Sequence, residues 1–283
     1  MHLIAYTQNH QDYIGLLEGE HFYRIAAQQE MTMLDFLQSS THAQQRIAQA
    51  AKAQHEAESL QTVQLLYPLS HPGKILCLGL NYADHAKESG HQKPEFPSIF
   101  LRSKHSLLAA EEAIWLPACS EKLDYEAELA VIIKTTAKHV SVDKALDIVG
   151  GYSCFNDVSV RDYQHKTSQW TLGKNFDRTG PFGPSICTPD AVPPGATGLA
   201  ISTSLNGRIV QEDNTDNMLF PVAETIALLS ECMTLEAGDV IVMGTPAGVG
   251  SARKPQLWMR PGDTVEIYIE KIGTLRNTIV SEP

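Results

Sequence analysis

Short apolar runs separated by polar turns open the chain. The turns, Asn9-His10-Gln11-Asp12 and Glu18-Gly19-Glu20, are made of residue types that interrupt strands. The pattern therefore predicts three short strands, at residues 3–6, 13–17 and 22–25.

Capping residues followed by helical periodicity predict two helices next. Thr32 predicts the N-cap of a short helix. Ser40 or Thr41 predicts the start of a longer helix, rich in Ala and Gln, that runs through Glu58. Because this part of the chain carries no constellation of chemical groups, we interpret residues 1–70 as a small appended α/β domain.

From residue 74 onward the pattern is mostly that of β-structure. Apolar and β-branched runs alternate with Gly, Pro, Asn and Asp, and Asn206-Gly207 is typical of a two-residue hairpin turn. The predicted strands are residues 75–80, 98–101, 128–133, 199–205, 240–243 and 264–269. The predicted helices are residues 85–88, 142–148, 158–164 and 222–230. We therefore predict an α+β, predominantly β fold, in which residues 71–283 form a coiled or barrel-like domain with helices outside.

The net charge of the chain argues against some classes of binding partner. The sequence has 22 basic and 33 acidic residues, a net charge of −11. This balance disfavours binding to nucleic acid or to an anionic membrane. No apolar run approaches the roughly 18 residues of a membrane span, and no secretory signal is visible. We expect a small-molecule partner instead.

The cysteines indicate a reducing environment. They are odd in number and scattered, and none forms a C-x-x-C pair, so neither a zinc site nor a disulfide framework is predicted. They are Cys77, Cys119, Cys154, Cys187 and Cys232. We predict a cytoplasmic protein in which each thiol fills the core rather than reacts.

Three carboxylates form the first candidate site. Glu126 and Glu128 stand at the entry to the predicted buried strand, and side chains two positions apart leave the same face of a strand. Asp157, in Asn156-Asp157-Val158-Ser159, offers a third oxygen ligand. Such a set of hard donors suits Mg²⁺ or Mn²⁺. The alternative is a strand end whose acids point into water, because such pairs are common on exposed strands.

A histidine and a glutamate follow the predicted strand at residues 75–80. His85 and Glu88 lie three apart, which places them on one face of a helix. A carboxylate can orient a histidine and make it more basic, so that it acts as a general base for water. The other interpretation is an exposed amphipathic turn with an incidental pair.

Arg161 and Gln164 follow Asp157 on a predicted helix. If that helix begins after Asp157, both side chains lie roughly beneath it. Arg161 would then pair with a substrate carboxylate or with the acids of the site, and Gln164 would donate to a carbonyl oxygen. A structural ion pair is the alternative for Arg161.

Two more residues are candidates for binding negative charge. Lys174, flanked by glycine and aromatic residues, would stabilise an enolate or a carboxylate, although a surface position is the alternative. Thr245 lies in the glycine-rich loop 244–250, which lacks the lysine of a P-loop. We interpret this loop as bringing backbone N–H groups and the Thr245 hydroxyl to an anionic end of the substrate, and a structural turn is the alternative.

Taken together, these motifs resemble the fumarylacetoacetate hydrolase family over nearly all of the chain from about Lys74 to Val280. So many motifs in one order make the resemblance specific. They are Gly79-Leu80-Asn81-Tyr82 with His85, Asp124-Tyr125-Glu126-Ala127-Glu128-Leu129, Gly151-Tyr152, Asn156-Asp157-Val158-Ser159, Gln169-Trp170 with Gly173-Lys174, Asn206-Gly207, Gly238-Asp239-Val240 and Gly244-Thr245-Pro246-Ala247-Gly248-Val249-Gly250.

The resemblance implies a mixed β-roll catalytic domain, usually assembled as a homodimer. It implies a divalent metal held by Glu126, Glu128 and Asp157. The water-activating dyad of the family, on a lid over the substrate, corresponds to His85 and Glu88. The positions that bind the substrate or an intermediate correspond to Arg161, Gln164, Lys174 and Thr245.

Two positions depart from the pattern of the family. Met243 stands where many relatives have Thr, which changes a small polar group beside the pocket into an apolar one. Arg102-Ser103-Lys104 replaces the commoner Lys-Pro at the end of a strand. The first departure bears on substrate preference.

The implied chemistry begins with a 2-oxo acid that chelates the metal, which acts as a Lewis acid. Water activated by His85, with Glu88 behind it, would attack the distal carbonyl. The C–C bond would then break because the departing carbanion is a metal-bound enolate, with Lys174 sharing its charge. We therefore predict a Mg²⁺- or Mn²⁺-dependent hydrolase of acylpyruvate-like or 2,4-dioxo acids.

The same site supports other reactions, so fold and site do not choose among them. Without the attack of water it would decarboxylate oxaloacetate. By moving protons it would isomerise or hydrate unsaturated 2-oxo dioates of aromatic degradation. His85 and Glu88 favour hydrolysis modestly, and the complete set of acids, base and lysine disfavours a non-catalytic dicarboxylate-binding protein.

Overall fold

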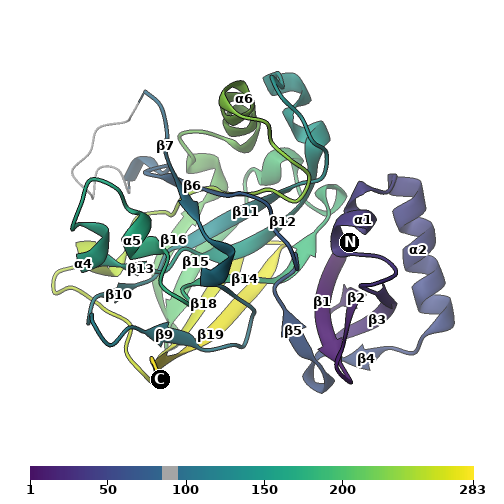
Figure 1. Cartoon of the computed structure of the whole chain (residues 1–283), viewed down its shortest axis with the longest axis horizontal. Helices are drawn as coiled ribbons and strands as arrows, with labels where there is room; N and C mark the ends of the chain where they lie inside the picture. Colours follow the sequence, from purple (N-terminus) through teal and green to yellow (C-terminus); the bar gives the residue numbers. More distant parts are fainter. Residues whose placement is uncertain (85–94) are drawn as a thin grey trace.

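A computed structural model of the protein describes residues 1–84 and 95–283. His85 and Glu88 lie outside these described residues. Figure 1 shows the N-terminal strands and helices on one side of the molecule and the larger β-rich part on the other. Within the described residues, no helix is long and apolar enough to cross a membrane.

One large sheet joins both parts of the molecule. Among the described residues it has twelve strands, ten of them in the order β4-β3-β2-β1-β14-β12-β11-β17-β6-β7, with β5 paired to β1 and β8 to β14. These strands are β1 (His2–Gln8), β2 (Gln11–Glu18), β3 (His21–Ala27), β4 (Glu58–Ser59), β5 (Gln64–Leu66), β6 (Ile75–Gly79), β7 (Ser98–Arg102), β8 (Leu107–Leu108), β11 (Ala127–Ile133), β12 (Val149–Asn156), β14 (Gly180–Cys187) and β17 (Val240–Val242).

A second sheet of five strands, in the order β16-β15-β18-β19-β9, packs against the first. Its strands are β9 (Ile114–Leu116), β15 (Ala200–Leu205), β16 (Arg208–Asn214), β18 (Thr264–Ile269) and β19 (Gly273–Ser281). The predicted hairpin turn joins β15 to β16, with positive φ angles of 52° at Asn206 and 77° at Gly207. The predominantly β fold is therefore confirmed.

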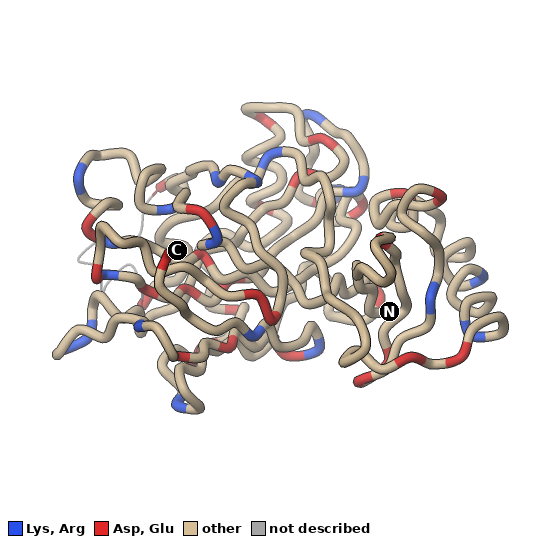
Figure 2. Tube along the Cα trace, turned by 60° about the horizontal axis from the view of Figure 1, so that its bottom comes forward, with Lys and Arg blue, Asp and Glu red and all other residues tan. Residues whose placement is uncertain are grey.

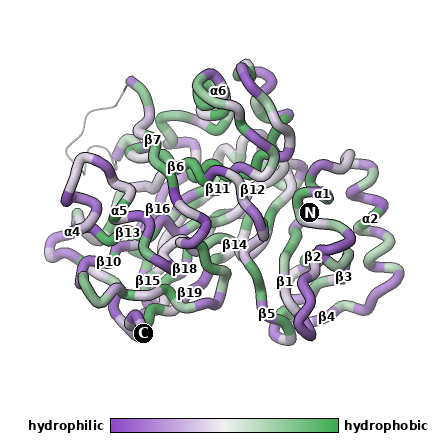
Figure 3. The backbone as a smooth tube through the Cα atoms, viewed as in Figure 1, coloured by the Kyte–Doolittle hydropathy of each residue, from purple (hydrophilic) through white to green (hydrophobic). Residues whose placement is uncertain are grey.

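Strand β11 lies between two apolar layers, which explains why its sequence is apolar without alternation. Leu129, Val131 and Ile133 pack with the five-stranded sheet on one side. Ala130 and Ile132 pack on the other side with residues of the N-terminal segment. Every residue of the strand is buried. In Figure 3, the green of hydrophobic residues lies along β6 and much of β11.

The N-terminal segment folds largely as its pattern predicts. Helix α1 (Met33–Gln38) begins after Thr32, whose side chain forms a capping box with Asp35. Helix α2 (Thr41–Gln54) is capped by Ser40 but ends before the predicted Glu58, because Glu58 pairs with β3 as part of β4. Strand β1 also pairs with β14. The division into domains 1–70 and 71–283 stays a proposal.

The sequence pattern does not predict two strands of the large sheet, β12 and β14, because they contain glycine and proline. Strand β12 carries Gly150 and Gly151, and a Cβ added at Gly151 would lie 2.4 Å from a side-chain carbon of Ile186 in β14. Strand β14 itself begins Gly180-Pro181. Small residues therefore allow two neighbouring strands to approach closely, which lowers the apparent strand propensity of both.

Two predicted helices differ from the structure. Residues 142–148 form a 3₁₀-helix, η3 (Val142–Ile148). The helix predicted at residues 158–164 begins only at Arg161, as α4 (Arg161–Gln164). Before it, β13 (Ser159–Val160) pairs with β10 (Leu123–Asp124), so tertiary pairing overrides the helical pattern. The remaining prediction, residues 222–230, is found as α6 (Val222–Cys232).

Candidate active site

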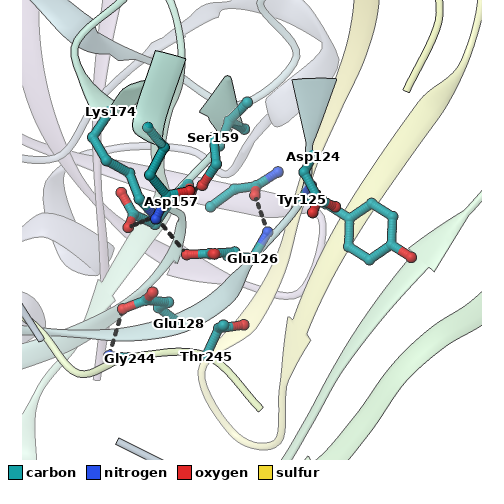
Figure 4. Close-up of polar contacts among 12 residues, drawn as sticks. Asp124, Tyr125, Glu126, Glu128, Asp157, Ser159, Lys174, Gly244 and Thr245 are labelled. Atoms are coloured by element: carbon teal, nitrogen blue, oxygen red, sulfur yellow. Dashed lines mark hydrogen bonds and ion pairs between the residues drawn. The ribbon is translucent and has the colours of Figure 1, made fainter. Parts of the chain in front are cut away.

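The three predicted carboxylates lie together in the structure. One oxygen from each of Glu126, Glu128 and Asp157 lies within 4.8 Å of the others, and all three side chains are buried. Strands β11 and β12 bring them together, because Ala127 is paired with Asn156 in the antiparallel register. Glu126 therefore precedes β11 at the end of the sheet where Asp157 follows β12. Figure 4 shows the three carboxylates facing one another.

Lys174 lies against two of these carboxylates. Helix α5 (Thr171–Lys174) presents its ammonium group 2.7 Å from Glu126 Oε2 and 2.5 Å from Asp157 Oδ2. Burial lowers the pKa of Lys174, but the negative charges of Asp157 and Glu126 outweigh it and leave the pKa above its usual value. The lysine is therefore a buried cation of the site and not a surface residue (Figure 4).

Glycine allows α5 to reach this position. A Cβ added at Gly173 would lie 2.4 Å from the backbone nitrogen of Gln164, so α5 and α4 touch through this residue. The ring of Trp170 packs directly on Gly79, because a Cβ added at Gly79 would lie 2.1 Å from a ring carbon of Trp170. The same ring contacts Phe100 edge-on. These close contacts fix one wall of the site.

Arg161 pairs with the acids of the site. Its Nε lies 2.8 Å from Asp124 Oδ2 and its Nη2 lies 2.7 Å from Glu126 Oε1. Its Nη1 donates to Gln164 Oε1 at 2.9 Å. Burial lowers the pKa of Arg161, but Asp124 and Glu126 outweigh it and raise the pKa. The contacts match the internal pairing that the sequence analysis left open for this residue.

Glu128 is the carboxylate with the least compensation. Among the described residues no cationic side chain lies within ion-pair distance of Glu128, and the backbone N–H of Gly244 donates to its Oε2. Burial raises the pKa of Glu128 well above its usual value, and repulsion from Asp157 and Glu126 adds to the effect. A negative charge on Glu128 is therefore unfavourable unless a cation compensates it.

The residues present fit a divalent metal ion. The buried groups comprise four carboxylates, with Asp124 added to the three, and three cations: Arg102, Arg161 and Lys174. Oxygen donors of this kind, with one negative charge uncompensated, suit a hard cation such as Mg²⁺ or Mn²⁺.

A cavity of about 690 Å³ opens beside the carboxylates. Its lining is mixed: Glu126, Glu128 and Lys174 contribute charge, and Leu78, Phe100, Trp170, Val249 and Trp258 contribute apolar surface. Arg161, Gln164 and Thr245 line it as well. The cavity is large enough for a small organic acid. Figure 2 shows acidic and basic residues interspersed along the rest of the chain.

Two backbone N–H groups of the glycine-rich loop donate hydrogen bonds to carboxylates of the protein itself. The N–H of Gly244 is engaged by Glu128 and that of Gly250 by Asp124 Oδ1, at 2.7 Å for the second contact. These two amides are therefore not available to an anionic substrate, because buried carboxylates already use them. Thr245 is buried, accepts a hydrogen bond from Gln211 at 2.9 Å and still lines the cavity.

One expectation about a single residue changes in the structure, and two residues of the site were missed. Asp157 does not stand at a helix N-terminus, because β13 separates it from α4. Asp124, which the sequence reasoning passed over, holds Arg161 and the backbone of Gly250 and Ser251. Its place two residues before Glu126, in a motif already singled out, was the available signal. Arg102 was missed too, although its departure from the family pattern marked it.

Known proteins are similar to this chain over most of its length. A sequence model of the fumarylacetoacetate (FAA) hydrolase C-terminal domain matches residues 74–280. The oxaloacetate tautomerase Fahd2a of Rattus norvegicus mitochondria is 38% identical over 250 residues, which cover 88% of this chain and 80% of that protein.

Solved structures of the same kind align along the whole chain. The fumarylacetoacetate hydrolase of psychrophilic Exiguobacterium antarcticum has 34% identity and a TM-score of 0.85, with all of both chains covered. Maleylpyruvate hydrolase from Sphingobium sp. SYK-6, in complex with a manganese(II) ion and pyruvate, has 28% identity and a TM-score of 0.83, again with all of both chains covered.

Proposed function

The chain belongs to the fumarylacetoacetate hydrolase family, and from this premise we propose that it is a divalent-metal-dependent enzyme acting through the enolate of a small 2-oxo acid. The observation that carries the proposal is the buried cluster of Glu126, Glu128 and Asp157 beside Lys174, at the edge of a cavity of about 690 Å³. Such a cluster would hold a cation, next to the Lys174 ammonium, where a carbonyl oxygen would become negative.

Glu126, Glu128 and Asp157 would hold the metal ion, which we propose to be Mg²⁺ or Mn²⁺. When bound, the ion would supply Lewis acidity to the oxygens of the substrate. The relative in complex with manganese and pyruvate supports both the metal and the class of ligand.

The protein's own side chains would bind and polarise the substrate. The Lys174 ammonium, held by Glu126 and Asp157, places fixed positive charge at the floor of the cavity. The aromatic rings of Trp170 and Phe100 contribute an apolar wall to the cavity. Gln164 and Thr245 present polar atoms on the cavity surface, where a carboxylate or carbonyl of the substrate would lie. Positive charge in a partly dry site stabilises a developing enolate.

Keto–enol tautomerisation of an oxaloacetate-like acid is the first candidate reaction. It requires only the transfer of a proton between the carbon beside the carbonyl and the carbonyl oxygen. The 38% identity to an oxaloacetate tautomerase over 88% of the chain favours it. Decarboxylation of the same acid would use the same enolate.

Hydrolysis of a C–C bond in an acylpyruvate-like or 2,4-dioxo acid is the second candidate. The maleylpyruvate hydrolase structure favours it, and so do His85 and Glu88, whose spacing suits activation of water. Isomerisation or hydration of unsaturated 2-oxo dioates would use the same enolate chemistry.

A panel of substrates tests the proposal and separates these candidates. The purified enzyme is assayed with enol-oxaloacetate, acylpyruvates, 2,4-dioxo sugar acids and unsaturated 2-oxo dioates, each with Mg²⁺, with Mn²⁺ and with excess EDTA. We expect turnover of at least one class, with loss of activity in EDTA and recovery on addition of metal. Full activity in EDTA would contradict the metal dependence.

Replacement of His85 should separate hydrolysis from enolate chemistry. If His85 activates water, His85→Ala should lower the hydrolysis of an acylpyruvate by about 10²–10⁴-fold, the range of general-base contributions. Oxaloacetate decarboxylation should fall far less, because it needs no attacking hydroxide. Glu88→Gln should show a milder form of the same difference. Equal losses in both reactions would assign the pair to substrate binding or closure instead.

We propose a homodimer, as is usual in the family. Analytical ultracentrifugation at micromolar concentration should give a species near twice the monomer mass of 31.1 kDa. A single species at the monomer mass would contradict this assembly.

A cytoplasmic location remains a proposal. Cys77, Cys154 and Cys187 are buried and free, which agrees with a reducing compartment. Cys119 and Cys232 are free and exposed, so the expectation that each thiol fills the core is wrong for these two.

A further inference from the structure

Arg102 ends β7 and lies beneath the carboxylate cluster with its side chain fully buried. Its guanidinium makes five hydrogen bonds, which equals its number of N–H donors. Nη1 donates to Asp157 Oδ1 at 2.5 Å and to the carbonyl oxygen of Val158 at 3.2 Å. Nη2 donates to the carbonyl oxygen of Thr179 at 2.6 Å and to its Oγ1 at 2.9 Å. Nε donates to Ser106 Oγ at 3.3 Å.

The two oxygens of Asp157 have different partners. Oδ1 accepts from Arg102, whereas Oδ2 accepts from Lys174, which also pairs with Glu126. Arg102 itself is not among the residues that line the cavity. It therefore acts on the site through Asp157 and does not touch a substrate.

We propose that Arg102 is a positioning residue for the metal ion: it holds Oδ1 of Asp157, which fixes the orientation of this carboxylate in the cluster with Glu126 and Glu128, and thereby sets the affinity of the site for the ion. The inference rests on the proposed metal dependence and assigns a role to a residue that the proposed mechanism does not use. Partners that orient a ligating carboxylate control metal affinity in this way.

The planar fork of arginine is what the position requires. Ser106, Thr179 and Asp157 surround the guanidinium, so it links the turn after β7, the start of β14 and the metal-binding turn after β12. A lysine ammonium carries the same charge but is a single point on a flexible stem, and it cannot reach all three groups at once. The arginine that departs from the commoner lysine of the family thus makes a more rigid support for Asp157.

Metal affinity of Arg102→Lys tests the inference. Binding of Mn²⁺ to the full-length protein is measured by calorimetry, with Arg178→Lys as the matched control. Arg178 also donates hydrogen bonds, to Ala113 and Glu112, but touches none of the three carboxylates. We expect Mn²⁺ to bind Arg102→Lys about 10–100-fold more weakly than wild type, the range for such partners, and Arg178→Lys to bind as wild type does. At saturating Mn²⁺, Arg102→Lys should regain most of the wild-type kcat.

Thr179→Val is a milder second variant. It removes the hydroxyl that accepts from Nη2 and leaves the contact between Arg102 and Asp157 in place. Its affinity for Mn²⁺ should fall between those of wild type and Arg102→Lys. If both variants bind Mn²⁺ as tightly as wild type and only melt at lower temperature, Arg102 is a structural residue and the inference is wrong. If wild type itself binds no Mn²⁺, the proposed metal dependence fails first, which is a separate result.

Discussion

Glu128→Gln should abolish the binding of Mg²⁺ or Mn²⁺ and lower metal-dependent turnover by more than ~100-fold. This exceeds the ~10–100-fold effect of residues that only orient a ligand, because Glu128 is itself one of the three proposed ligands. The amide has nearly the same shape as the carboxylate but carries no charge. It therefore removes the negative charge, and leaves only a weaker neutral oxygen ligand, without opening a cavity.

The stability of Glu128→Gln should move in the opposite sense from its activity. Glu128 is buried, lies near two other acids and has a strongly raised pKa. Loss of its charge should therefore leave the melting temperature of the metal-free protein unchanged or higher. Addition of Mn²⁺ should raise the melting temperature of wild type and not that of the variant.

Calorimetry with Mn²⁺ and thermal unfolding with and without EDTA check this pair of results. Glu121→Gln is the matched control, since its side chain is 87% exposed and lies outside the carboxylate cluster. It should behave as wild type in every measurement. Wild-type affinity for Mn²⁺ in Glu128→Gln would remove Glu128 from the set of ligands.

Lys174→Met should both inactivate the enzyme and destabilise the metal-free fold by about 3–5 kcal/mol. Removal of one partner from a buried ion pair leaves an uncompensated charge, and this is the usual cost of such a change. Here two carboxylates, Glu126 and Asp157, would lose their common cation. Met has a similar length, so packing is largely kept.

Metal should rescue the stability of Lys174→Met but not its activity. A divalent ion compensates Glu126 and Asp157 in place of the lost ammonium, so Mn²⁺ should restore part of the free energy of unfolding. Turnover should stay low, because the fixed positive charge at the floor of the cavity is missing.

Urea denaturation in EDTA and in Mn²⁺, together with an activity assay, checks this result. Lys144→Met is the control: Lys144 and Asp147 are 69% and 71% exposed, and such a pair contributes ~1 kcal/mol at most. A stability of Lys174→Met equal to that of wild type in EDTA would show that the buried pairs are not needed by the fold.

The sequence by itself determined the elements that depend on local chemistry. The apolar run of β11, the cap at Thr32 and the turn at Asn206-Gly207 each follow from short-range preferences, and the structure contains all three. The order of motifs also identified the family, because each motif is short and contiguous.

Tertiary structure decided what depends on partners distant in the sequence. Strands β12 and β14 form despite their glycines because close packing against each other repays a low propensity. Residues 159–160 pair with β10 and delay the helix to Arg161.

The same distinction holds within the site. The spacing of Glu126 and Glu128 predicted a shared face, since strand geometry is local. The pairing of Lys174 with Glu126, 48 residues away, and of Arg102 with Asp157, 55 residues away, was not readable from spacing. The acids and cations of the site come from strands and from short helices that only the folded chain brings together, so only the folded chain shows which cations compensate which acids.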